Sequence, residues 1–154
     1  MKKIFVIASI FLISNVFGQV ITPKASPVAK IQQKVGLADI QIEYSRPGAK
    51  GRVIFGDLIP FDAMWRLGAN ENTKITCSDA LIFGKDTLKA GTYAIFAKPG
   101  KQNWELYFYS DFSNWGLPET WDAQKVALQV NAPVLKIQDF QENLEINIDG
   151  ITNS

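Results

Sequence analysis

The sequence predicts an all-β protein, an antiparallel β-sandwich or jelly-roll-like fold of about nine short strands. Three observations predict it. Short segments alternate between apolar and polar residues, the period of a half-buried strand, as in residues 38–44 and 144–148. Turn-forming glycine, proline and aspartate residues separate these segments at short intervals. Outside the N-terminal leader, no stretch has the spacing of a helix of ordinary length.

Residues 1–18 have the pattern of a signal peptide. Two lysines precede an apolar run over residues 4–13, and the small residue Gly18 stands before Gln19. The apolar run is shorter than the roughly 20 residues that a membrane-spanning helix needs. We therefore expect export to the periplasm or the cell exterior, with no membrane span after cleavage.

The rest of the chain suits one domain. Cleavage after Gly18 leaves 136 of the 154 residues, enough for a hydrophobic core. Residues 19–28 contain two prolines and no periodicity, so we expect an extended N-terminal arm, followed by a single domain over residues 29–154. Loss of the two leader lysines changes the formal net charge from +1 to −1, which gives no electrostatic reason to bind nucleic acid.

The expected strands follow one another along the chain. Gly36 separates the first two, which are expected to form a hairpin, and a turn at residues 84–86 separates another pair. A short strand over residues 52–55 and a single helical turn over residues 61–65 are expected within a long loop. The other strands are expected at residues 29–35, 38–44, 73–78, 81–83, 87–88, 92–98, 104–109, 124–131, 134–139 and 144–148.

The end of the sequence carries one more turn signal, Asp149-Gly150, which predicts a further strand after it. Few residues follow, so either the sheet lacks its last strand or the short tail pairs only weakly. Residues 144–148 would then form an unpaired edge, able to pair with a strand of another chain.

The polar loop over residues 44–73 is the candidate site, because a long ordered loop on a rigid scaffold is a common place for function. It carries four cationic residues, Arg46, Lys50, Arg52 and Arg66. Guanidinium groups bind carboxylate or phosphate through paired hydrogen bonds, so the loop would suit a small anionic ligand. The alternative is that the arginines hold their own loop, through nearby carboxylates and backbone carbonyls.

The acidic and amide side chains of the same loop allow other roles. Asn70, Glu71 and Asn72 would bind a sugar hydroxyl or a cation, or would simply satisfy backbone groups in a turn. Glu71 with Asp57 or Asp62 is a weak candidate for a hydrolytic acid–base pair. No other catalytic residue is predicted.

The tryptophans offer a stacking surface for carbohydrate, with large core residues as the alternative. Trp115, beside Gly116 in a loop, is the one most expected to be exposed. The predicted ligand-binding set is Arg46, Lys50, Arg52, Trp65, Arg66, Asn70, Glu71, Asn72 and Trp115.

Two residue counts exclude whole classes of chemistry. The absence of histidine removes Ser-His-Asp and Cys-His catalysis and histidine-ligated zinc. Cys77 is the only cysteine, which removes internal disulfides and thiolate metal clusters, and we expect its thiol to be buried. We predict neither a cofactor nor a metal site.

One long stretch resembles a known family. Residues 42–76 read IEYSRPGAKGRVIFGDLIPFDAMWRLGANENTKIT, and residues 84–96 read GKDTLKAGTYAIF. With Trp104 and the Asn-Trp-Gly turn at residues 114–116, these blocks are similar to a secreted bacterial family, domain-of-unknown-function family 2911. The resemblance implies a secreted all-β domain and no particular reaction. The chain departs from the family at Cys77, where an aromatic residue is more usual, and in lacking the last strand.

The leading hypothesis is an exported, non-enzymatic binding module that uses the loop over residues 44–73 to hold a small anionic or carbohydrate ligand, or a partner. One alternative is a hydrolase that uses Glu71 with a nearby aspartate. Another is a structural envelope protein whose edge at residues 144–148 pairs with a second chain.

The leader predicts cleavage before Gln19 when the chain is expressed in an exporting bacterium. Intact-mass measurement of the exported protein should give the mass of residues 19–154. A mature form that still contains Met1 would contradict the prediction.

Overall fold

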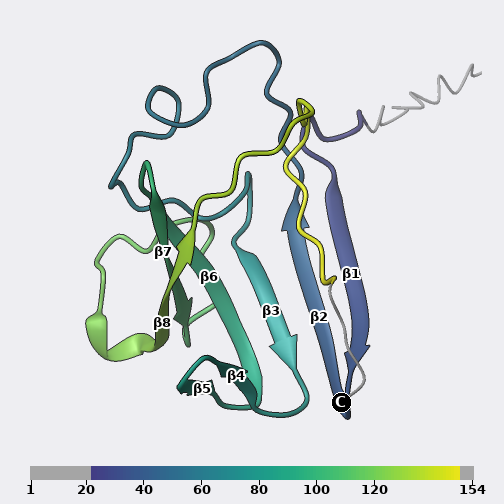
Figure 1. Ribbon diagram of the computed structural model, residues 1–154, viewed down its shortest axis with the longest axis vertical. Coiled ribbons are helices and arrows are strands. Elements are labelled where there is room, and N and C mark those ends of the chain that lie inside the picture. The colour runs from purple at the N-terminus through teal and green to yellow at the C-terminus, as the bar shows by residue number, and fades with distance from the viewer. Residues whose placement is uncertain (1–21, 150–154) are drawn as a thin grey trace, which may run out of the picture.

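The computed structural model describes residues 22–149 (Figure 1). This part of the chain contains eight strands and one short 3-10 helix, so the predicted all-β antiparallel class is confirmed. The elements are β1 (Val28–Val35), β2 (Ala38–Ser45), β3 (Thr73–Cys77), β4 (Leu81–Phe83), β5 (Asp86–Leu88), β6 (Gly91–Pro99), β7 (Asn103–Tyr109), η1 (Ala123–Lys125) and β8 (Val126–Pro133).

Six strands form one antiparallel sheet in the order β1-β2-β3-β6-β7-β8, and β4 and β5 form a separate hairpin (Figure 1). Gly36 joins β1 to β2 with a positive φ of 59°, which a residue without a side chain adopts at little cost. The register places Ile42 opposite Ile75 across β2 and β3. A bulge at Phe108 and Tyr109 shifts the pairing of β7 with β8.

The main core covers one face of the sheet. Alternate residues of β2 and β3 point into it, and Leu88 of the β4–β5 hairpin is 0% exposed. The chain beyond β8 covers the rest of this face with Leu144, Ile146 and Ile148, which are half-buried against the same cluster. Cys77 lies within this core, so the predicted burial of its thiol is confirmed.

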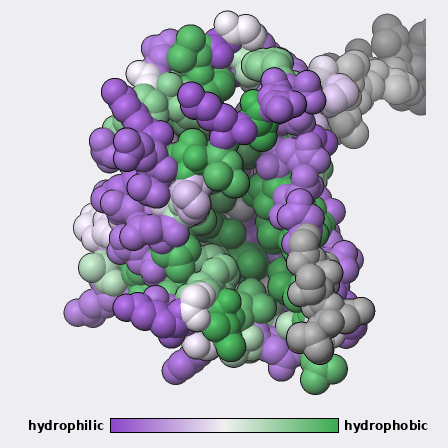
Figure 2. Space-filling view, viewed as in Figure 1, coloured by the Kyte–Doolittle hydropathy of each residue, from purple (hydrophilic) through white to green (hydrophobic). Residues whose placement is uncertain are grey.

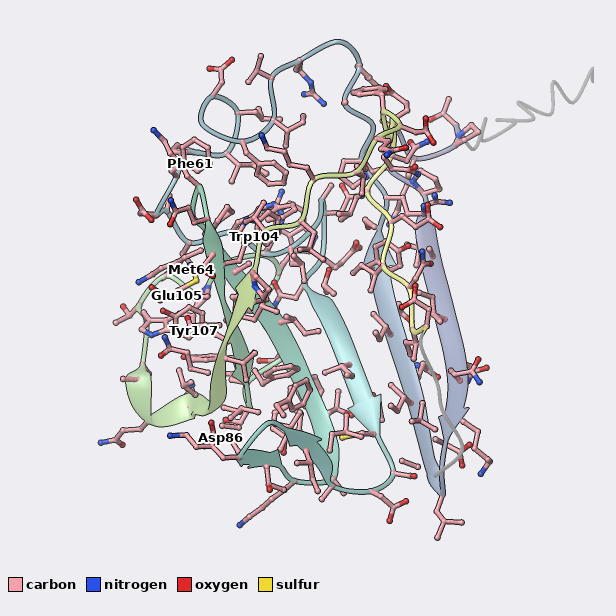
Figure 3. The ribbon with its side chains drawn as sticks, in the orientation of Figure 1. Phe61, Met64, Asp86, Trp104, Glu105 and Tyr107 are labelled. Atoms are coloured by element: carbon pink, nitrogen blue, oxygen red, sulfur yellow. The ribbon has the colours of Figure 1, made fainter. Side chains whose placement is uncertain are left out.

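A second apolar cluster covers the opposite face at β6 and β7. Phe96, Tyr107 and Tyr109 surround the ring of Trp121, which stacks on Tyr109 at 4.7 Å between ring centroids. Burial and donation of its hydroxyl to Glu105 raise the pKa of Tyr107 to about 12 (Figure 3). The sandwich-like second layer is therefore built from a hairpin and irregular segments instead of a second large sheet.

Four local predictions are wrong, and each lies in an irregular stretch. Residues 134–139 are not a strand, because β8 continues through Pro133 and the chain then leaves the sheet. Residues 52–55 are irregular, with a single bridge from Phe55 to Ile59. Residues 61–65 form a turn and a bend that end at the bridge from Trp65 to Ala97, instead of a helical turn. Residues 144–148 cross the face of the sheet instead of forming an edge strand. The predicted signal peptide and the region beyond Asp149 lie outside the described residues.

The hairpin side chain Leu88 should contribute strongly to stability, because it is 0% exposed at the junction of β5 and the main core. We expect Leu88→Ala to lower the free energy of unfolding by about 2–5 kcal/mol, measured by urea denaturation. Leu37→Ala is the matched control, since Leu37 is 90% exposed and its truncation should change stability by less than about 0.5 kcal/mol. Equal effects of the two substitutions would contradict this account of the core.

Candidate functional site

A cleft of about 1220 Å³ lies between the long loop of residues 46–72 and the segment of residues 134–149, which we call the C-terminal segment. Both stretches are irregular and lie beside each other at one end of the sheet (Figure 1). Figure 2 shows apolar side chains exposed in the middle of this face, with polar residues flanking them on both sides. The cleft is therefore open to solvent, although much of its wall is apolar.

Large apolar side chains line the cleft from both stretches. The loop contributes Phe55 and Leu58, and the C-terminal segment contributes Leu135, Ile137 and Phe140. Leu135 is 81% exposed and Phe140 is 78% exposed, and the other three are also exposed. Single exposed apolar residues need no explanation, but a group of them around one cleft marks a binding surface.

Aromatic packing holds the loop in place. Phe55, Trp65 and Trp104 meet edge to face, with ring centroids 4.9 to 5.9 Å apart. The backbone of Trp65 exchanges two hydrogen bonds with Ala97 of β6, at 2.7 and 2.8 Å. The indole nitrogen of Trp65 also donates to the carbonyl of Gly68 at 3.1 Å. The loop is thus fixed to the sheet although it has no regular secondary structure.

Backbone hydrogen bonds join the loop to the C-terminal segment, and we call this set of contacts the clamp. Ala49 N–H donates to the carbonyl of Glu142 at 2.7 Å, and Leu144 N–H donates to the carbonyl of Pro47 at 2.9 Å. The Glu142 carboxylate accepts from the Lys50 N–H at 2.8 Å. These bonds satisfy backbone groups outside the sheet, and their residues Pro47, Ala49, Glu142 and Leu144 line the cleft.

Further along the same segment, the Ile146 N–H donates to the hydroxyl of Tyr44 at 3.1 Å. Gly48, which forms an isolated antiparallel bridge with Asn143, comes close to the segment: a Cβ there would lie 2.9 Å from a Glu142 carboxylate oxygen. The tight approach explains why this position of the loop suits glycine.

Two of the three arginines hold the loop, as one of the two interpretations expects. Arg46 donates from Nε to the carbonyl of Leu144 at 3.1 Å, and Arg52 donates to the carbonyls of Ala49 and Gly48 at 3.0 and 2.8 Å. The partners are backbone carbonyls and not carboxylates. Among residues 22–149 three ion pairs form, and none of them includes an arginine.

Arg66 differs from the other two. Its Nε is buried and has no hydrogen-bond partner among the described residues, and its guanidinium lies 5.4 Å from the ring centroid of Trp115. Arg66 also contributes to the wall of the cleft. Such a buried cationic donor without a partner is unusual, because removal from water costs free energy unless an acceptor replaces the lost hydrogen bond.

The amide residues of the loop have structural partners. Asn70, with a positive φ of 56°, donates to the carbonyl of Ser26 and the hydroxyl of Ser45. Asn72 is buried and donates to the carbonyl of Asn114 at 2.7 Å, while its own carbonyl oxygen has no partner among the described residues.

The acidic candidates Glu71, Asp57 and Asp62 do not line this cleft. Glu71 pairs with Lys24 at 3.3 Å, and hydrogen bonds from its own backbone N–H and from Lys24 lower the pKa of its carboxyl group. Asp57 and Asp62 are exposed and have no part in that ion pair. A lowered pKa keeps Glu71 ionised, which does not suit a general acid.

Of the nine predicted ligand-binding residues, the cleft brings together Arg52, Trp65 and Arg66. Trp115 lies on a neighbouring loop and is 66% exposed. The wall residues Leu135, Ile137 and Phe140 were missed. Leu135 and Ile137 have an apolar pattern that predicts a strand over residues 134–139, and Phe140 lies just beyond that expected strand.

Comparison with known proteins identifies the family of the chain. Residues 26–154 match the family whose description reads "Protein of unknown function (DUF2911)". Searches of curated proteins and of solved structures found no match. Within residues 22–149, no helix is long and apolar enough to cross a membrane, and no group of three or more metal-ligating side chains is gathered.

The clamp makes a specific prediction about local stability. Glu142→Ala removes the acceptor of the Lys50 N–H, and loss of one hydrogen bond of about 1 kcal/mol should speed amide exchange in residues 47–50 and 142–146 about fivefold. Hydrogen–deuterium exchange with mass spectrometry measures this change. In the matched control Glu145→Ala, the removed carboxylate bonds only to Gln141 and Asn147, so exchange in residues 47–50 should stay as in the wild type. Unchanged exchange in the Glu142 variant would contradict the role of the clamp.

Proposed function

The chain belongs to the family described as "Protein of unknown function (DUF2911)", and from its structure we propose that it is an exported binding protein for an elongated apolar ligand that carries an anionic group. The observation that carries the proposal is the cleft of about 1220 Å³, whose wall exposes five large apolar side chains beside Arg66. The loop over residues 44–73 supplies one wall, as the leading hypothesis expects, and the C-terminal segment supplies the other.

The size and lining of the cleft favour an elongated apolar ligand. Sites for compact small molecules usually measure about 300–1000 Å³, and this open cleft is larger. Each methylene group of an acyl chain that leaves water for such a wall contributes about 0.8 kcal/mol. Phe140 and Leu135 are mostly exposed, so a ligand that covers them removes apolar surface of both the protein and the ligand from water. This burial favours binding.

Arg66 supports an anionic group on the ligand. Its Nε has no partner among the described residues, whereas Arg46 and Arg52 already donate to carbonyls. A hydrogen bond between a guanidinium and a carboxylate is roughly twice as strong as a neutral one, and more so away from bulk water. The wall also carries three carboxylates, Asp139, Glu142 and Glu145, of which Glu142 and Glu145 accept hydrogen bonds from neighbouring residues.

Export is supported by the leader pattern of residues 1–18 and by cysteine usage. The single thiol, Cys77, is 2% exposed, which protects it in an oxidising compartment. An exported protein meets free fatty acids, lipids and other amphipathic molecules, which have the chemistry that the cleft suits.

The test uses dodecanoate as the ligand and displacement of the fluorescent probe 8-anilinonaphthalene-1-sulfonate as the readout. We expect saturable binding of the probe, displacement by dodecanoate, and weaker displacement by uncharged dodecanol. Arg66→Met should weaken dodecanoate binding about tenfold and leave dodecanol unchanged, because it removes the cation and its hydrogen-bond donors and keeps an apolar side chain. Phe140→Ala should weaken the binding of both ligands.

Two matched variants control this experiment. Phe112→Ala truncates an exposed phenylalanine outside the cleft, and Lys85→Met removes a cation from the turn between β4 and β5. Both should bind like the wild type. Absence of saturable probe binding, or equal binding by the wild type and the Phe140 variant, would overturn the proposal.

A further inference from the structure

A second cleft, of about 400 Å³, opens on the loop between β7 and β8. Its lining includes Trp115, Asp111, Glu119, Thr120 and Lys125, so it combines one large aromatic ring with several polar groups. It shares no residue with the wall of the larger cleft. Its volume falls within the range of about 300–1000 Å³ that is usual for small-molecule sites.

Trp115 is the most exposed tryptophan of the chain, although exposure of a large aromatic ring to water is costly. It is 66% exposed, whereas Trp65, Trp104 and Trp121 are half-buried and pack against other aromatic rings. The guanidinium of Arg66 lies over the Trp115 ring at 5.4 Å, and Arg66 does not line the second cleft. Arg66 therefore contacts the Trp115 ring from outside the second cleft.

Contacts of the residues on either side of Trp115 hold its ring in position. The amide of Asn72 donates to the carbonyl of Asn114 at 2.7 Å and so joins the loop to the start of β3. Gly116 is buried with a positive φ of 79°, and a Cβ at this position would lie 3.3 Å from a guanidinium nitrogen of Arg66. A side chain there would be strained and would disturb the contact between Arg66 and Trp115. The exposed ring is therefore a pre-positioned surface.

Polar groups surround this ring. Asp111 accepts from Lys125 at 2.7 Å and from the Ser113 hydroxyl at 2.6 Å, and these hydrogen bonds hold the pKa of its carboxyl group well below the usual range. Glu119 and Thr120 are exposed beside it. The cleft thus offers the held carboxylate of Asp111, the exposed carboxylate of Glu119 and the hydroxyl of Thr120 as partners for ligand hydroxyl groups, next to an aromatic ring.

We propose that this second cleft is a saccharide-binding site in which the exposed ring of Trp115 stacks on the apolar face of a sugar ring. The C–H groups of that face meet the electron-rich face of the indole, while the sugar hydroxyls donate to Asp111 and Glu119 and accept from Thr120 or Lys125. The cleft carries carboxylates of both Asp111 and Glu119 against the single ammonium of Lys125, which opposes an anionic ligand such as phosphate. A neutral oligosaccharide satisfies the aromatic surface and the polar groups together.

The test is titration of the mature protein with four neutral trisaccharides: cellotriose, chitotriose, maltotriose and laminaritriose. Saturation-transfer NMR detects binding, and calorimetry measures the dissociation constant. We expect at least one of the four to bind and Trp115→Ala to weaken that binding at least about tenfold, since truncation of an aromatic anchor removes much of the binding energy. Glu119→Gln should weaken it less, because an amide keeps one acceptor.

Phe112→Ala is the matched control, because Phe112 is an exposed aromatic residue of the same loop that does not line the cleft. It should bind the saccharide like the wild type. Excess dodecanoate should not displace the saccharide, which separates this site from the proposed function of the larger cleft. Binding of none of the four trisaccharides, or equal binding by the wild type and the Trp115 variant, would overturn the saccharide site and leave the larger cleft unaffected.

Discussion

The antiparallel contact between residues 46–50 and 142–146 is the interaction on which the rest of the structure depends. The sheet carries an apolar cluster on each face, the second of them only at β6 and β7, and no second large sheet covers either cluster, so irregular chain must do so. Irregular chain brings backbone N–H and C=O groups that need partners, since an unpaired buried group costs about 1–3 kcal/mol. The bonds from Ala49 to Glu142 and from Leu144 to Pro47 supply those partners. They also place the apolar residues just before Glu142 above the loop, and this placement creates the larger cleft.

The sequence predicted the regular part of this fold well and the irregular part poorly, for a physical reason. The strands near residues 38–44 and 92–98 were predictable because alternation and the turn residues that bound them are local properties. Residues 134–139 and 144–148 also alternate, yet they form no strand. Their apolar residues line the cleft or pack on the face of the sheet instead of pairing at its edge. Alternation reports that one side of an extended segment is apolar and does not specify which surface receives that side.

The candidate site shows the same limit. Charge and glycine content identified the loop that forms one wall of the cleft, but the sequence could not rank its three arginines. Arg46 and Arg52 meet carbonyls that lie close only after folding, and Arg66 reaches a tryptophan about fifty residues further along the chain. The wall residues Leu135 and Ile137 had a visible apolar signal, but their role depends on where the chain leaves β8. The spacing of residues along the chain does not predict contacts between residues that are far apart in the sequence.

The late position of the C-terminal segment has a consequence for how the chain reaches its final state. Ile146 donates to Tyr44, which precedes it by 102 residues, and closing a loop of that length costs about 4 kcal/mol of chain entropy before the contact forms. The main core is therefore incomplete until the C-terminal segment docks, because Leu144, Ile146 and Ile148 cover part of it. Contacts between residues this far apart in the sequence are slow to form, because the entropy of loop closure must be overcome before the contact can stabilise the chain.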